Sequence, residues 1–168
     1  MNDLKLYHQD APAFDSFTAP LIGLPVSHVW RGNGSSLFIE FGKLHPRSLR
    51  DGSVQLRDDG SQSRQNGDWS LMIEWSWRIE GPRSIICGSW SKEGRWPRAF
   101  SLLQNATVVS ARVFGRLPEI EITFSNRLDV LSFMTSNGDP AWVLFDLRSP
   151  RARWIYVRRG SLEIEEGD

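Results

Sequence analysis

The sequence predicts a single, mainly antiparallel all-β domain, a roll or a sandwich with at most minor helix. Apolar and polar residues alternate over short runs, the runs are rich in β-branched and aromatic residues, and turn residues separate them. At 168 residues the chain fits one domain with a sizeable core, to which eight tryptophans contribute. Its one cysteine, Cys87, excludes an internal disulfide.

The first elements in chain order are an N-terminal extension over 1–20, with a turn of helix at 10–17, and the main β domain over 21–168. Strands are expected at 26–30 and 36–41, joined by a tight hairpin because Asn33-Gly34 tolerates positive φ. The mostly polar stretch at about 43–68 is expected to be a surface loop with a small hairpin near 54–56.

The run 69–80 carries the strongest signal. All its odd positions are apolar, so one continuous strand would bury six side chains on one face, among them Trp69, Trp75 and Trp77. Later strands are separated by the Gly-Pro, Gly-Arg-Leu-Pro and Asn-Gly-Asp-Pro turns and are expected at 84–90, 107–114, 119–124, 128–134, 142–147, 153–158 and 161–165. Segments 21–26 and 37–41 echo 102–103, 108–113 and 119–124, which suggests two similar halves.

Catalytic and metal-binding patterns are weak, so the chain is expected to be no enzyme and to need no cofactor or metal. Cys87 is expected to be a buried thiol, although a pairing with His8, His28 or His45 stays open. Glu119 and Glu121 share a strand face, which also leaves acid–base chemistry open. The oxygen-bearing residues of the polar loop match no calcium-binding spacing; they are Asp58, Asp59, Asn66 and Asp68.

Charge argues against a general nucleic-acid binder, since twenty basic and twenty acidic side chains cancel. One exception is the stretch from Arg148 to Arg159, where five arginines surround Trp154 and Tyr156 in a pattern that suits phosphates and bases. Acidic residues follow at once, so the main interpretation is a hairpin whose arms neutralise each other; they are Glu163, Glu165, Glu166 and Asp168.

A protein-binding surface is the remaining candidate. Trp90 and Trp96 flank a turn that contains Arg95, and exposed Trp beside Arg is typical of interface hot spots. The polar face of the 69–80 run adds an ordered set of charges, Glu74, Arg78 and Glu80. These six residues are the predicted partner-binding site.

Four sequence words look like a family of uncharacterised bacterial all-β proteins: WSWRIE at 75–80, GSWS at 88–91, LPEI at 117–120 and GDPAW at 138–142. Proteins of this kind resemble immunity proteins, which bind and block a cognate toxin. The resemblance implies a non-enzymatic protein that occludes a partner protein. A cytoplasmic location is expected because the first ten residues show no secretory signal pattern and no apolar run is long enough to span a bilayer. A homodimer, a nucleic-acid-binding module and a small-molecule-binding protein stay open as alternatives, and no membrane-spanning run is expected.

Overall fold

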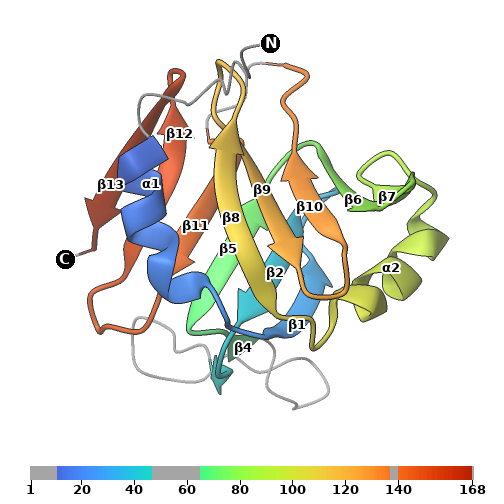
Figure 1. Ribbon diagram of the computed structural model, residues 1–168, viewed down its shortest axis with the longest axis horizontal. Coiled ribbons are helices and arrows are strands. Elements are labelled where there is room, and N and C mark those ends of the chain that lie inside the picture. Colours follow the sequence, from blue (N-terminus) through green and yellow to red (C-terminus); the bar gives the residue numbers. More distant parts are fainter. Residues whose placement is uncertain (1–10, 47–64, 137–139, 168) are drawn as a thin grey trace, which may run out of the picture.

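Two antiparallel β-sheets pack face to face around the core, with a helix at each of two opposite sides (Figure 1). This computed structural model describes residues 11–46, 65–136 and 140–167. The six-stranded sheet has the order β1 (Val26–Arg31), β2 (Leu37–Phe41), β5 (Trp69–Ile73), β11 (Trp142–Asp146), β12 (Arg153–Arg158) and β13 (Ser161–Glu166). The five-stranded sheet has the order β7 (Ser84–Gly88), β6 (Trp77–Gly81), β10 (Asp129–Ser132), β9 (Glu119–Phe124) and β8 (Val108–Phe114). The predicted fold class is confirmed.

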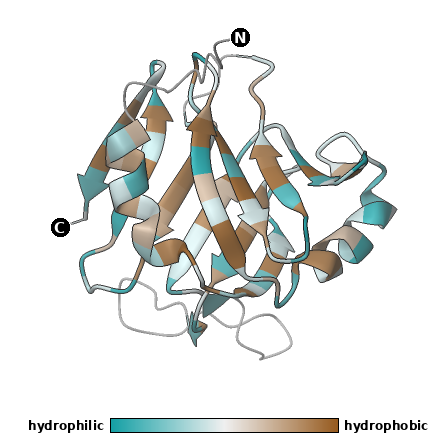
Figure 2. Cartoon of the chain, in the orientation of Figure 1, coloured by the Kyte–Doolittle hydropathy of each residue, from teal (hydrophilic) through white to brown (hydrophobic). Residues whose placement is uncertain are grey.

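Alternating side chains explain the sandwich. Figure 2 shows polar and apolar bands alternating along the front strands, as a sheet with one buried face requires. The inward positions carry fully buried side chains from both sheets, including Ile39, Leu71, Ile79, Ile122 and Val130. A hairpin joins β1 to β2 through Asn33-Gly34 as predicted, but only Gly34 has positive φ (60°), and the connection spans residues 32–36.

The run 69–80 is the main correction to the predicted elements. It forms two strands in different sheets, because the chain bends at residues 74–76 and crosses from β5 to β6. Backbone bonds fix the bend: Glu74 N–H donates to Ala141 O (2.8 Å) and Phe133 N–H donates to Ser76 O (3.0 Å). Trp69 and Trp77 are fully buried as expected, but Trp75 lies on the bend and is 53% exposed.

Two helices close the sides of the sandwich. Helix α1 (Ala11–Thr18) continues into a 3₁₀ turn, η1 (Ala19–Leu21), and Phe14 of α1 is fully buried against Trp142 (ring centroids 6.1 Å apart). One face of residues 11–20 of the expected extension therefore belongs to the core, through Ala11, Phe14, Phe17 and Thr18. Helix α2 (Trp96–Leu103), preceded by the turn η2 (Glu93–Arg95), was not predicted.

The polar stretch at 43–68 contains a two-residue ladder, β3 (His45–Pro46) with β4 (Gln65–Asn66). Asp68 closes its base, accepting from Lys43 N–H (2.8 Å) and lying 2.9 Å from His45 Nε2. The expected hairpin near 54–56, together with Asp58 and Asp59, lies outside the described residues.

The two halves of the chain repeat one topology. The first half runs through α1, the neighbouring strands β1, β2 and β5, and a hairpin β6–β7 that joins the opposite sheet. The second half runs through α2, β8, β9 and β10, and then sends β11–β12 back to the first sheet. Strand β13 extends the second half and has no described counterpart in the first. The expected pair of similar halves is therefore confirmed at the level of topology.

Backbone contacts where the halves meet follow the same symmetry. Gly23 N–H donates to Val108 O, and Asn105 N–H donates to Val26 O, both at 2.9 Å. Gly23 and Asn105 occupy equivalent places and both have positive φ, 90° and 65°. Each segment thus makes the bond that its counterpart makes.

The buried indoles repeat this relation. Trp77, at the start of β6, donates its Nε1–H to Ser35 O in the β1–β2 turn (2.5 Å). Trp142, at the start of β11, donates to Pro118 O in the β8–β9 turn (2.9 Å). Each Trp therefore ties a crossing hairpin to the first turn of its own half.

Candidate protein-binding surface

The turn after β7 presents Trp90 to solvent at 85% exposure. Its backbone is held from both sides: Ser89 N–H donates to Trp77 O (2.9 Å) and Ser91 N–H donates to Gly88 O (2.9 Å). Gly88 N–H in turn donates to Ser91 Oγ (3.0 Å). The exposed indole therefore stands on a well-ordered turn.

A second exposed indole belongs to a neighbouring segment. The bond from Ser89 to Trp77 joins the Trp90 turn to the start of β6, which directly follows the bend at residues 74–76, and Trp75 lies in that bend. Ser35 Oγ donates to Trp75 O (3.3 Å), which ties the bend to the β1–β2 turn. We define Trp75 and Trp90 as the indole pair.

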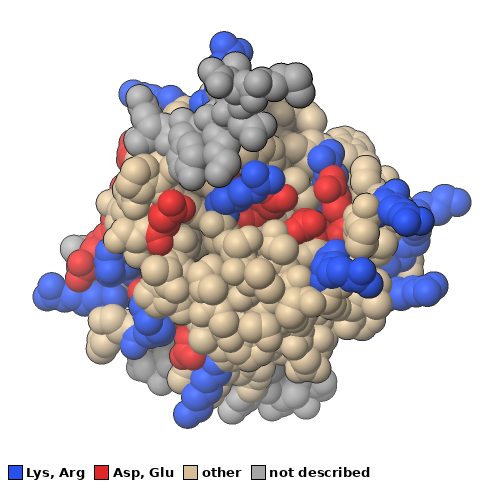
Figure 3. Space-filling view, in the orientation of Figure 1, with Lys and Arg blue, Asp and Glu red and all other residues tan. Residues whose placement is uncertain are grey.

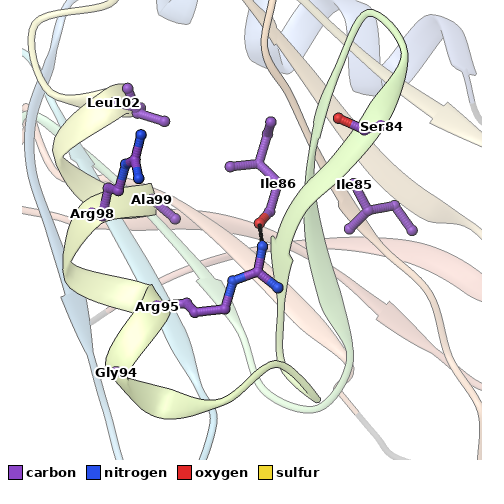
Figure 4. A pocket seen from close by; sticks show the side chains of 8 residues that line it. All are labelled: Ser84, Ile85, Ile86, Gly94, Arg95, Arg98, Ala99 and Leu102. Carbon is purple, nitrogen blue, oxygen red and sulfur yellow. Dashed lines mark hydrogen bonds between the residues drawn. The ribbon is translucent and has the colours of Figure 1, made fainter.

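Helix α2 lies beside β7 and leaves a groove of about 520 Å³ between them (Figure 4). Arg95 reaches across and donates through Nη2 to Ile86 O (3.2 Å). Arg98 and Leu102 follow along the helix, and Figure 4 shows them on the side that faces β7. Figure 3 shows Lys and Arg side chains gathered at this end of the molecule, where the exposed cations include Arg31, Arg83, Lys92, Arg95 and Arg98.

Trp96 was predicted to contact a partner, but it is only 4% exposed. It begins α2 and packs inward against Trp77 (5.8 Å between ring centroids), while its Nε1–H donates to Gly88 O (3.1 Å). The Arg31 guanidinium lies 5.2 Å from its ring centre and forms an ion pair with Glu93 (2.7 Å). Trp96 is therefore a residue that fixes α2 onto the sheets.

The other predicted residues occupy three places. Trp90 and Arg95 lie at the end of the molecule that carries the Trp90 turn, η2 and α2, which we call the α2 end. Arg78 and Glu80 lie on the outer face of the five-stranded sheet, 2.5 Å apart in an ion pair, with Arg78 over the Phe133 ring (5.4 Å). Glu74 lies in the bend, because the crossing between sheets separates it from that face. The structure therefore does not bring the six residues onto one surface.

Two components of the α2 end were not predicted from the sequence, Trp75 and Arg98. The helical spacing of apolar residues would have revealed α2, since Trp96, Ala99, Phe100 and Leu103 recur at intervals of three and four. Pro97 in the first turn is a further helix-start signal. The bend that exposes Trp75 has no such signal, because alternation continues through it.

The arginines between Arg148 and Arg159 are largely engaged within the protein. Arg148 makes a bidentate pair with Asp146 (Nε–Oδ1 and Nη2–Oδ2 both 2.8 Å), which lowers the pKa of the Asp146 carboxyl, and its guanidinium lies 5.1 Å from the Trp69 ring centre. Arg153 lies over Phe17 (5.3 Å). These contacts weaken the nucleic-acid alternative.

Across the β12–β13 hairpin, acidic side chains face this basic stretch. Arg158 lies 3.6 Å from Glu163. The Tyr156 hydroxyl donates to Glu165 and also to Glu163, and these bonds, together with burial, raise the pKa of Tyr156 to about 12. The expected hairpin with mutually neutralising arms is therefore present.

The candidate catalytic residues are used structurally or lie apart. Glu121 accepts from Arg112, and Glu119 accepts from Ser132 Oγ and Met134 N–H, both at 2.5 Å. Cys87 is buried, whereas two of its candidate partners, His28 and His45, are exposed and the third, His8, lies outside the described residues. Within the described residues no three His, Cys, Asp or Glu side chains converge as a metal site would require.

Comparison with protein-family models, with curated proteins and with solved structures found no match to this chain. No helix in the described parts is long and apolar enough to cross a bilayer. The surface chemistry of the α2 end is therefore the basis for a functional assignment.

Proposed function

We propose that this chain is a non-enzymatic protein-binding module that recognises its partner through the indole pair, with Trp90 as the main anchor. The observation that supports this most directly is the 85% exposure of Trp90 on a turn held by backbone hydrogen bonds. An indole in this position contributes little to folding, because its apolar surface stays in water. It offers a large rigid contact area to a partner instead.

Rigidity is the second support. Binding costs less when the anchoring groups are ordered beforehand, since little conformational entropy is then lost. The Trp90 turn follows a strand of the sandwich, and the Trp75 bend is held by Ser35 and Ala141. Trp and Arg also dominate interface hot spots. A preformed surface of this kind suits occlusion of a partner.

The proposed partner class rests on the sequence words that look like a family of uncharacterised bacterial proteins, since proteins of this kind resemble immunity proteins. Two of these words, WSWRIE and GSWS, contain Trp75 and Trp90 themselves. We therefore propose a toxin of the same or a rival strain as the partner, blocked by direct contact. No catalytic residue of this chain is needed for such protection.

Co-expression with candidate toxins encoded beside this chain tests the proposal. The wild-type protein is expected to restore growth of cells that make the toxin and to form a complex with it. Trp90→Ala is expected to lose both effects, whereas Leu117→Ala, which removes another exposed apolar side chain in the β8–β9 turn, should retain them. Protection by Trp90→Ala equal to that of the wild type would contradict the role of this surface.

A further inference from the structure

The internal symmetry relates β7 to a strand that has a further neighbour in its own sheet. In the repeated topology β7 corresponds to β12, and α2 corresponds to α1. Strand β12 has a neighbour on its outer side, β13, which pairs with it from Arg153–Glu166 to Arg158–Ser161. Strand β7 is the last strand of its sheet, and the groove lies along it in place of such a neighbour.

The groove is lined by both apolar and basic side chains. Ile86, Ala99 and Leu102 give it apolar walls, and Ile85 is 58% exposed beside it. Arg95 and Arg98 lie along one side of the groove, one helical turn apart. Among the described residues Arg98 forms no ion pair, so its charge is available to a ligand.

Strand β13 shows the matching pattern within this chain. Its sequence, Ser-Leu-Glu-Ile-Glu-Glu, alternates apolar and acidic residues, and Glu163 and Glu165 lie opposite Tyr156 and Trp154 of β12. Acidic side chains two residues apart on a strand point to one face, about 7 Å apart. That spacing is similar to the separation of Arg95 and Arg98 on α2, about 5–6 Å between Cβ atoms.

We infer that the groove between β7 and α2 binds an extended, acidic segment of a partner protein, added to β7 as β13 is added to β12. A backbone N–H of the segment donates to the Ile86 carbonyl in place of Arg95. The guanidinium groups of Arg95 and Arg98 then bind carboxylates of the segment. Pairing ends at Gly88, whose carbonyl is already bonded to Trp96 and Ser91. In strand addition of this kind, main-chain hydrogen bonds supply affinity and side-chain contacts supply specificity.

This inference goes beyond the proposed function, because it assigns a ligand chemistry to a surface other than the indole pair. It is tested on the full chain with an acetylated and amidated peptide, Ser-Leu-Glu-Ile-Glu-Glu, followed by ¹H–¹⁵N spectra at low salt and millimolar peptide. Resonances of 84–86 and of 95–102 are expected to shift. Arg98→Glu, or a peptide with Gln in place of each Glu, should weaken binding at least about tenfold.

Arg116→Glu, the same charge change at an exposed turn, is the matched control and should leave peptide affinity unchanged. Trp90→Ala should also bind the peptide normally, so that failure of the groove and failure of the proposed function are distinguishable. The spectra themselves report whether each variant is folded. Absent shifts, equal binding of the Gln peptide, or shifts of these residues by a single-stranded oligonucleotide but not by the peptide would overturn the inference.

Discussion

At the residue scale, the three fully buried tryptophans each pack against a ring from a helix. Trp69 lies 5.4 Å from Phe17 between ring centroids, Trp142 contacts Phe14 and Trp77 contacts Trp96. Truncating a buried ring to Ala costs about 3–5 kcal/mol, because contacts and burial are lost together. Trp90 contrasts with this group, since its exposed ring carries little of the folding free energy.

Glu40 is a buried carboxylate that organises the outer side of β2. It accepts hydrogen bonds from Gly67 N–H (2.8 Å), Ser70 Oγ (3.0 Å) and Trp30 Nε1–H (3.0 Å). Glu40→Ala leaves these donors without their acceptor, so we expect a loss of about 3 kcal/mol in the free energy of unfolding. Chemical denaturation measures it, with Glu40→Gln expected to be intermediate because it keeps one acceptor oxygen. A loss below about 0.5 kcal/mol for Glu40→Ala would refute this role.

Asp146 links stability to pH. Hydrogen bonds from Arg148 hold its pKa below the ordinary 3.8, against the opposing effect of burial. A lowered pKa means that the folded state binds its proton less readily than the unfolded state does. The stabilisation is therefore complete above about pH 4 and is lost as the pH falls through the folded-state pKa.

We expect Asp146→Asn to cost about 1–2 kcal/mol at pH 7 and to show a smaller further loss below pH 4 than the wild type. Denaturation curves at several pH values give both quantities. Asp15→Asn, at an exposed position of α1, is the control and should follow the wild type. If the free energy of unfolding fell equally below pH 4 for Asp146→Asn and for the wild type, this would contradict a pKa of Asp146 lowered by Arg148.

At the element scale, the alternation of apolar and polar residues predicts the strands but not the bend and the helix that connect them. The pattern identified the strands well, because each has one buried and one outer face. It predicted β5 and β6 as one strand, because apolar and polar residues continue to alternate through the bend. It therefore predicted that Trp75 would be buried. It also missed α2, whose eight residues carry an apolar period of three to four between two β-rich segments. Trp96 was consequently predicted to be exposed.

The segments that lead from a helix into β1 and β8 depend on positive φ at equivalent residues, Gly23 and Asn105. No atom lies within 4 Å of a Cβ added at Gly23, so Gly23→Ala tests backbone strain alone. We expect it to cost about 1–2 kcal/mol in thermal or chemical unfolding. Gly94→Ala, also in open space but without positive φ, should be neutral or slightly stabilising. Equal effects at the two sites would argue against strain at Gly23.

At the scale of the whole molecule, the fold class and the two similar halves followed from periodicity and from repeated apolar segments. The arrangement of the candidate site did not, because it depends on which strands cross between sheets. Arg78 and Glu80 remained on an outer face, Trp96 turned inward, and Trp75 and Arg98 joined the α2 end. Such placements arise from long-range packing, which a local pattern does not contain.

The central claim is that a preformed surface around Trp90 binds a partner protein. Its most direct test is the dissociation constant of the purified complex for the wild type, Trp90→Ala and Leu117→Ala, measured by calorimetry on variants of matched stability. Trp90→Ala is expected to weaken binding by about 2 kcal/mol or more, roughly thirtyfold, with Leu117→Ala close to the wild type. Wild-type affinity for Trp90→Ala would contradict the claim.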